Sequence, residues 1–262
     1  MRSTATIAAV FAGVAACRDV PANLQSFYAS HKDVGCADSI SIQYSSGQGD
    51  ADTVYCKDDA SGAVFLKDSS NGYADVDIDC DGAGMGTGDC GNDPSGQSMT
   101  AFKDLVQQYS NGAIDDLNTH IHNFVVLGND NSAEEGDGGQ SFDPTADAGI
   151  QPLSVVAVVC GEKLLYGVWG DVNGGKLTGE ASISLAKQCF PDEDITGDSG
   201  HGDHDVLYLA FPGEEAIAKD VNWGAADATE FEASLATIGD ELVKKVASGQ
   251  AKSRVMRASL TV

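Results

Sequence analysis

Leu153-Ser-Val-Val-Ala-Val-Val159 is a short run in which apolar residues occupy both faces of an extended chain. Successive side chains of a β-strand point to opposite faces, so this run predicts a central strand that is covered on both sides. Around it, an apolar period of two recurs and predicts further strands over 62–66, 73–79, 124–128, 164–169, 181–185 and 205–211. The sequence therefore predicts a fold built mainly from β-strands.

Three segments have a helical apolar period instead: 21–31, 100–109 and 229–247. The first begins with Pro21 and the second with Thr100, which suit the start of a helix. The third presents one apolar stripe with charged residues outside it, formed by Phe231, Leu235, Ile238, Leu242 and Val246. We predict that these helices lie outside the strands, which gives a mainly β fold with peripheral helices (α+β).

The overall charge excludes one large class of partner. The chain carries 40 Asp and Glu against 15 Lys and Arg, a formal net charge of −25. Nucleic acid is therefore excluded as a partner, because binding to a phosphate backbone depends on many Lys and Arg contacts. No internal apolar run approaches the roughly 20 residues of a membrane span, so we expect no membrane association. We also expect the protein to be a monomer.

The N-terminal residues 1–17 differ from the rest of the chain. Met1-Arg2 precede a small apolar stretch from Ala5 to Ala16, which is too short to span a bilayer and has the features of a secretory signal. A buried N-terminal helix is the alternative. We predict a signal peptide over 1–17, a single domain over 18–249 and a loose tail over 250–262, and hence a secreted, extracellular protein.

The chain has seven cysteines, and Cys17 lies at the expected cleavage site. The other six allow 15 pairings, of which the most local joins Cys36 with Cys56, Cys80 with Cys90, and Cys160 with Cys189. A structural zinc site is the rival interpretation, but no pair has the close C-x2-4-C spacing that zinc ligation favours. We therefore expect disulfides.

Strict alternation marks Tyr73-Ala-Asp-Val-Asp-Ile-Asp-Cys-Asp81. In a strand it places Val76, Ile78 and Cys80 on the inner face and four carboxylates on the other, namely Asp75, Asp77, Asp79 and Asp81. Like charges at this spacing repel and raise some of the carboxyl pKa values. Three interpretations stay open: a cleft wall for a cationic substrate, a calcium site, and a solvated acidic face. The EF-hand loop that residues 77–82 begin is not completed, since its twelfth position is Gly88 and not Glu.

Segments 164–171 and 179–185 flank a turn-rich stretch and are predicted to form a hairpin. In that hairpin Asp171 and Glu180 stand near the loop end of adjacent strands, within reach of one cleft. Glycosidic hydrolysis needs two such carboxyl groups, one protonated to donate to the leaving oxygen and one ionised to activate water or to attack. An acidic protein places Asp and Glu in many hairpins, so the pair alone supports only a hypothesis.

Several longer motifs make the sequence resemble one family, the fungal chitosanases of glycoside hydrolase family 75. The motifs are Tyr73-Ala-Asp-Val-Asp-Ile-Asp-Cys-Asp-Gly82, Asn92-Asp-Pro-Ser-Gly96, Gln151-Pro-Leu-Ser-Val-Val-Ala-Val-Val-Cys160, Tyr166-Gly-Val-Trp-Gly-Asp-Val-Asn-Gly174, Gly179-Glu-Ala-Ser-Ile-Ser-Leu-Ala186, Cys189-Phe-Pro191 and Asp205-Val-Leu-Tyr208. The resemblance runs from about Pro21 to the helix ending near Ala247.

This resemblance implies a secreted enzyme that cuts the β-1,4 links of chitosan, a polymer of mostly deacetylated glucosamine, internally and with inversion. It implies that Glu180 is the general acid and Asp171 the general base. It also implies a closed or partly closed barrel, a six-stranded double-psi β-barrel. The alternative from a different class is a secreted, acidic, calcium-dependent carbohydrate-binding or interaction module without catalysis.

The substrate that the resemblance implies is a polycation, which suits the acidic composition. Asp75, Asp77 and Asp79 are the candidates for holding glucosamine amines. Tyr73, Trp169 and Tyr166 are candidates for stacking on sugar rings, with core packing as the alternative for each. We expect no cofactor and no metal, because His201 and His204 in their acidic, Gly-rich loop fit a solvated hydrogen-bonding pair better than a metal site.

Overall fold

The computed structural model describes residues 18–47, 51–130 and 141–258. The strands are β1 (Arg18–Asp19), β2 (Ser45–Ser46), β3 (Thr53–Lys57), β4 (Val64–Asp68), β5 (Ala74–Asp79), β6 (Phe124–Asn129), β7 (Val155–Cys160), β8 (Lys163–Asn173), β9 (Leu177–Thr178), β10 (Glu180–Ser182) and β11 (His201–Ala210). The helices are α1 (Ala22–Lys32), α2 (Lys103–Tyr109), α3 (Pro144–Ala148), α4 (Ile183–Cys189) and α5 (Ala228–Ala258), with 3-10 turns η1 (Gly88–Cys90) and η2 (Glu214–Ala216). The prediction of a mainly β fold with outer helices is confirmed.

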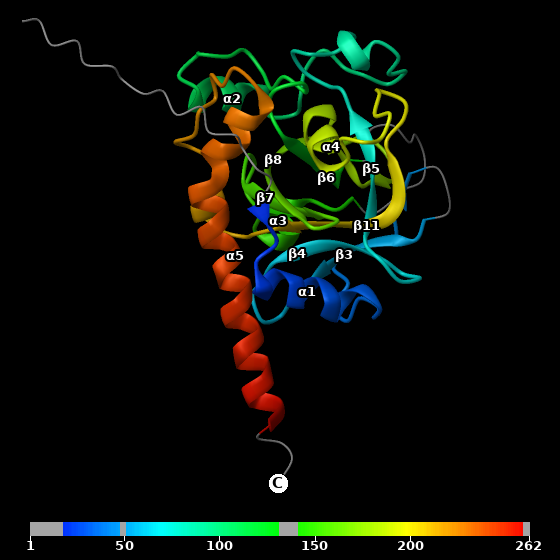
Figure 1. Ribbon diagram of the computed structural model, residues 1–262, viewed down its shortest axis with the longest axis vertical. Coiled ribbons are helices and arrows are strands. Elements are labelled where there is room, and N and C mark those ends of the chain that lie inside the picture. Colours follow the sequence, from blue (N-terminus) through cyan, green and yellow to red (C-terminus); the bar gives the residue numbers. More distant parts are fainter. Residues whose placement is uncertain (1–17, 48–50, 131–140, 259–262) are drawn as a thin grey trace, which may run out of the picture.

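One large sheet organises the described residues. Its strands pair in the order β1-β8-β6-β10-β5-β11-β4-β3, and β7 pairs with both β11 and β8. Because β7 links β11 back to β8, the middle strands of the sheet curl into a partial ring. Figure 1 shows these strands above α1 and beside α5. β6 runs parallel to β8, and β10 runs parallel to β5.

The predicted central strand is β7, and its two faces are both covered. Val155, Ala157 and Val159 belong to one apolar cluster, and Val156 and Val158 belong to a second. The first cluster lies between the sheet and the outer helices α1 and α5, and the second lies on the opposite face of β7. The continuous apolar run of β7 is thus explained, because neither of its faces meets water.

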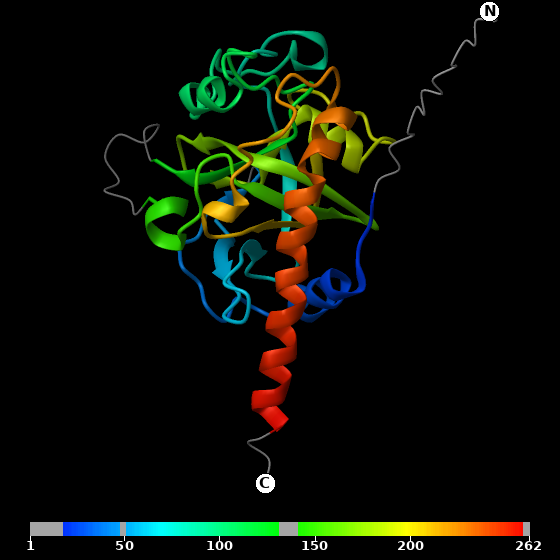
Figure 2. The same cartoon turned by 90° about the vertical axis from the view of Figure 1, so that its left-hand side faces the viewer.

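The long helix α5 lies against one side of the sheet and runs past its edge toward the C-terminal end (Figure 2). Gly239 allows this close packing, because a Cβ at that position would lie 2.4 Å from the ring of Tyr166. The sequence predicted that this helix ends near Ala247 and that a loose tail follows. That helix end is wrong, since α5 continues to Ala258. Residues 250–258 contain no proline and suit a helix.

None of the helices in the described part of the chain is long and apolar enough to cross a bilayer.

Three disulfides lie in the described part of the chain, and they join Cys36 with Cys56, Cys80 with Cys90, and Cys160 with Cys189. The most local pairing is therefore confirmed. The expected signal peptide and Cys17 lie outside the described residues.

One predicted strand is partly wrong. The segment 181–185 starts as β10, but helix α4 begins at Ile183. The side chain of Ser182 accepts a hydrogen bond from the backbone N–H of Leu185, so a serine at this position caps a helix and ends the strand. Strand β3, which pairs along its whole length with β4, was not predicted.

Candidate active site

Glu180 is the first residue of β10 and faces the aspartates of β5. The preceding Gly179 has φ of +89°, a conformation that favours glycine, and a Cβ there would lie 2.7 Å from Oδ1 of Asp75. β10 pairs in parallel with β5, so that Glu180 lies beside Asp77. Burial, followed by the charges of Asp77 and Asp171, raises the pKa of Glu180 to about 8, against a hydrogen bond from the amide of Asn173 that lowers it. Glu180 is therefore a carboxyl group that keeps its proton at neutral pH.

Asp171 lies near the end of β8 and has only 5% of its surface exposed. Its Oδ1 accepts hydrogen bonds from the backbone N–H groups of Ala101 (3.0 Å) and Val172 (2.7 Å). Its Oδ2 is buried and has no hydrogen-bond partner among the described residues. Burial raises the pKa of Asp171 to about 7, although the two N–H groups favour the ionised form.

The predicted hairpin that would join Asp171 to Glu180 is not formed. β8 pairs with β7 in an antiparallel hairpin, and β6 lies between β8 and β10 in the sheet. After Asn173 the chain leaves the sheet and forms the short strand β9, which pairs with β2. The two carboxyl groups nevertheless act on each other, because the charge of Asp171 raises the pKa of Glu180.

The aspartates of β5 extend the acidic cluster around Asp171. Carboxylate oxygens of Asp79, Asp81 and Asp171 lie within 4.8 Å of one another. Burial raises the pKa of Asp81 to about 6 and that of Asp79 well above its ordinary value, and for Asp79 the charges of Asp171 and Asp81 add to the effect. The expectation that a ladder of like charges raises carboxyl pKa values is confirmed. At neutral pH this cluster holds protons.

An open cleft of about 790 Å³ is lined by Asp77 and Ile78 of β5 and by Glu180 of β10. Burial followed by the charge of Asp75 raises the pKa of Asp77 to about 6. The cleft is also lined by Ser45, Gly47, Ser95, Lys176, Leu177 and the 197–200 segment. Asp171 is not among its lining residues.

The three aspartates that were proposed from the sequence as amine ligands differ in their position relative to the cleft. Only Asp77 lines it. Asp75 is 5% exposed, contacts the hydroxyl of Ser46 and is not among the lining residues, so its role as an amine ligand stays a prediction. Asp79, with 9% exposed, faces Asp171 and not the cleft.

The proposed sugar-stacking residues Tyr73, Tyr166 and Trp169 are buried, so that prediction is wrong and the core-packing alternative holds. The hydroxyl of Tyr73 donates to the carbonyl of Tyr28, and that of Tyr166 donates to Asp240 of α5. The rings of Tyr73 and Tyr166 fill the space between the sheet and the outer helices, and Trp169 belongs to the second apolar cluster. Among the described residues that line the cleft, none is aromatic.

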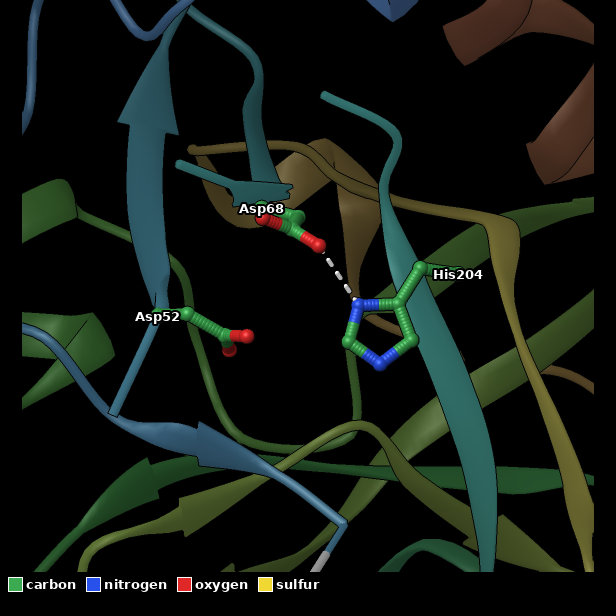
Figure 3. Close-up of side chains that lie close together, drawn as sticks. All are labelled: Asp52, Asp68 and His204. Atoms are coloured by element: carbon green, nitrogen blue, oxygen red, sulfur yellow. Dashed lines mark hydrogen bonds and ion pairs between the residues drawn. The ribbon is translucent and has the colours of Figure 1, made fainter. Parts of the chain in front are cut away.

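A second acidic cluster lies where β4, β11 and the start of β3 meet (Figure 3). Nδ1 of His204 donates to Oδ2 of Asp68 at 2.7 Å, and the Asp52 carboxylate points toward the same ring. His201 contacts Glu193 and Asp205 instead, so the predicted solvated pair of His201 and His204 is wrong. Each histidine has its own carboxylate partners.

Two residues of the site were not found from the sequence. Asn173 donates its amide to Oε2 of Glu180, and Asp198 lines the cleft from the loop between α4 and β11. The amide of Asn92 and the hydroxyl of Thr196 hold Asp198 in place. Asn173 lies two residues after Asp171 in the same motif, and this proximity was the only available signal.

A carboxyl group that keeps its proton on a cleft wall, with a second carboxyl group of shifted pKa close by, is typical of hydrolases that use acid–base chemistry. Comparison with known proteins gives the family within this class. Residues 76–245 match the family described as fungal chitosanase of glycosyl hydrolase group 75. The chain belongs to this family and is a glycoside hydrolase.

Curated relatives cover almost the whole chain. An endo-chitosanase of Aspergillus oryzae is 45% identical over 247 residues, which is 93% of this chain and 98% of the relative. Endo-chitosanase B of the same species is 43% identical over 249 residues, again 93% and 98%. An endo-chitosanase of Aspergillus fumigatus is 45% identical over 229 residues, 86% of this chain and 90% of the relative. Asp171 and Glu180 both fall inside the region that matches the family.

Proposed function

We propose that this chain is a secreted endo-chitosanase that hydrolyses the β-1,4 bonds between glucosamine units with inversion, with Glu180 as general acid and Asp171 as general base. The observation that carries the assignment is the contrast between the two carboxyl groups. Two backbone N–H groups stabilise the ionised form of Asp171, whereas Glu180 has one amide donor and lies beside Asp77. As the pH rises, Glu180 therefore keeps its proton to a higher pH than Asp171 does.

The reaction follows from these protonation states. Glu180 gives its proton to the glycosidic oxygen as the bond to the anomeric carbon breaks. Asp171 takes a proton from a water molecule, whose oxygen forms the new bond to that carbon on the opposite face of the ring. After one turnover Glu180 is ionised and Asp171 is protonated, and exchange with solvent restores both.

A polycationic substrate suits the raised carboxyl pKa values. Ammonium groups near the cluster favour ionised carboxylates, so binding lowers the pKa of Asp171 toward the mildly acidic range in which chitosan is charged and soluble. Asp77 lies on the cleft wall beside Glu180 and is the residue that we assign to an ammonium group of the substrate. The formal net charge of −25 attracts the polymer to the protein.

Secretion and the finer architecture belong to the same proposal. Three disulfides fit an oxidising compartment, and the N-terminal residues have the composition of a secretory signal. The six strands β8, β6, β10, β5, β11 and β7 pair in succession around the partial ring, which supports a double-psi barrel.

The test is to incubate pure protein with soluble chitosan and to follow viscosity and new reducing ends. A rapid fall in viscosity with few reducing ends is expected for internal cleavage, and proton NMR of the first products should show the α-anomer. Glu180→Gln and Asp171→Asn should each abolish the reaction and leave the circular dichroism spectrum unchanged. Unchanged viscosity with the wild type would reject the proposal.

A further inference from the structure

The cluster of Asp79, Asp81 and Asp171 contains one oxygen that lacks a partner. Oδ2 of Asp171 is buried and receives no hydrogen bond from the described residues, while Oδ1 receives two. An ionised carboxylate with a buried, unpaired oxygen is costly, on the order of 1–3 kcal/mol. A base that must be ionised therefore needs a donor at Oδ2.

The neighbouring carboxyl groups are the candidates for that donor, since oxygens of Asp79 and Asp81 lie within 4.8 Å of an oxygen of Asp171. Three carboxylates this close cannot all be ionised, so the cluster holds at least one proton. Asp81 is partly exposed and its Oδ1 accepts the N–H of Gln97, so solvent and backbone stabilise its charge. Asp79 is 9% exposed and has the least favourable surroundings for a charge.

The chain fixes Asp79 against Asp171. Asp79 is the last residue of β5, its Oδ1 accepts the backbone N–H of Asp81 at 2.7 Å, and its carbonyl accepts the hydroxyl of Thr119. The disulfide between Cys80 and Cys90 ties down the next residue. With Oδ1 engaged, Oδ2 of Asp79 is the atom left to carry the proton.

We propose that Asp79 is a positioning residue for the catalytic base, which holds a proton on its carboxyl group and donates it as a hydrogen bond to Oδ2 of Asp171. The inference rests on the proposed role of Asp171. Asp79 keeps its proton throughout the reaction, and its hydrogen bond stabilises the ionised base before water is activated. Charges that act on the pair come from Asp81 after β5, Asp116 in the loop after α2, and Glu180 on β10, and all of them are acidic.

The pKa shift of Asp79 agrees with this assignment. Burial is its largest cause and the charge of Asp171 the next, and together they raise the pKa well above the ordinary value. The proposed bond favours the ionised form of Asp171 and lowers its pKa. Removing the donor should therefore move the acidic limb of the pH–activity profile, which reports ionisation of the base, to higher pH.

Two variants of Asp79 separate a hydrogen-bond donor from a negative charge. Asp79→Asn replaces a neutral acid with a neutral amide whose N–H can donate to Oδ2 of Asp171. We expect kcat/KM on chitosan within about threefold of wild type and an acidic limb within about half a pH unit. Asp79→Ala removes the donor, and its acidic limb should move up by about one unit, which lowers kcat/KM below that limb about tenfold.

The pH profile is the decisive readout, because a merely structural role of Asp79 would lower the melting temperature without moving the limb. If Asp79→Ala does not fold, Asp79→Asn still decides: a loss of about 100-fold or more would overturn the proposal, since it would mean that a negative charge is needed. Loss of wild-type activity on chelation, restored by calcium alone, would also overturn it. An inactive wild type rejects the proposed function itself, whereas an active wild type with an inactive Asp79→Asn rejects only this inference.

Discussion

Asp68 and Asp79 each end a strand of the same sheet, and both are buried, with 4% and 9% of their surfaces exposed. Their pKa values nevertheless shift in opposite directions. Burial raises the pKa of both groups, but at Asp68 the hydrogen bonds from Ser70 and His204 outweigh burial and hold the value below its usual range. At Asp79 burial is reinforced by the charges of Asp171 and Asp81.

The difference lies in the neighbours and not in the depth of burial. Both oxygens of Asp68 receive hydrogen bonds, from the N–H and hydroxyl of Ser70 and from His204. Asp79 faces further carboxyl groups. A carboxylate surrounded by donors stabilises the fold as a fixed charge, whereas one surrounded by acids stores a proton. The following predictions test whether the two regions differ in this way.

Glu180→Gln should have the largest effect. It replaces the proposed acid with an amide that cannot give up a proton, so kcat on chitosan should fall by about 10³-fold or more, as measured by new reducing ends. Asp68→Asn is the matched control in the donor-rich region, and its kcat should stay within about threefold of wild type because Asp68 is not among the cleft residues. Equal losses in both variants would mean that the two regions do not differ in function.

The free energy of unfolding should depend on pH through Glu180. The pKa of this group is raised from 4.5 to about 8 in the folded protein, so its contribution to stability is fully present below pH 4 to 5 and is lost as pH rises through about 8. Glu180→Gln carries no such charge. Urea unfolding should therefore show nearly equal stabilities at pH 4 and a variant that is more stable by about 4–5 kcal/mol at pH 9. A difference that does not change with pH would contradict the raised pKa.

Asp68→Asn should show the opposite pH dependence and a smaller effect. The pKa of Asp68 is lowered in the folded protein, so its contribution is present above the unfolded pKa and is lost as pH falls through the folded value. We expect the variant to be less stable by about 1–2 kcal/mol at pH 7, with the deficit shrinking below about pH 4. Thermal unfolding across pH 3 to 7 measures it, and a deficit that persists unchanged at pH 3 would point to lost packing instead of a lost charge.

Much of the fold and part of the site were predictable from the sequence, and the difference again follows from what surrounds a residue. The run over 153–159 predicts a strand buried on both faces, because its apolar pattern is local, and the disulfides follow from short separations. The order of strands in the sheet is not local. Sequence adjacency suggested that Asp171 and Glu180 share a hairpin, but β6, from more than forty residues earlier, lies between their strands.

Aromatic residues show the same limit. Nothing in the local sequence around Tyr166 reveals that α5, some seventy residues later, will pack against its ring and that Asp240 will accept its hydroxyl. Asn173 and Asp79 are likewise given roles by neighbours that are distant in sequence or in the sheet. Residue type identified the acidic cluster and the family resemblance implied its acid and base, whereas the groups that contact them are given only by the tertiary arrangement.

Asp77 lies between the two regions and should give the smallest effect. It lines the cleft beside Glu180, and the charge of His204 lowers its pKa while burial and Asp75 raise it. If it holds a substrate ammonium group at the cleft wall, Asp77→Asn should raise KM for chitosan about threefold at low ionic strength, and the difference should shrink above about 0.5 M salt. Asp220→Asn makes the same change in net charge at an exposed position that is not among the cleft residues, so its KM should match wild type. Equal increases in KM for both variants would mean that the overall charge attracts the polymer and that Asp77 makes no contact of its own.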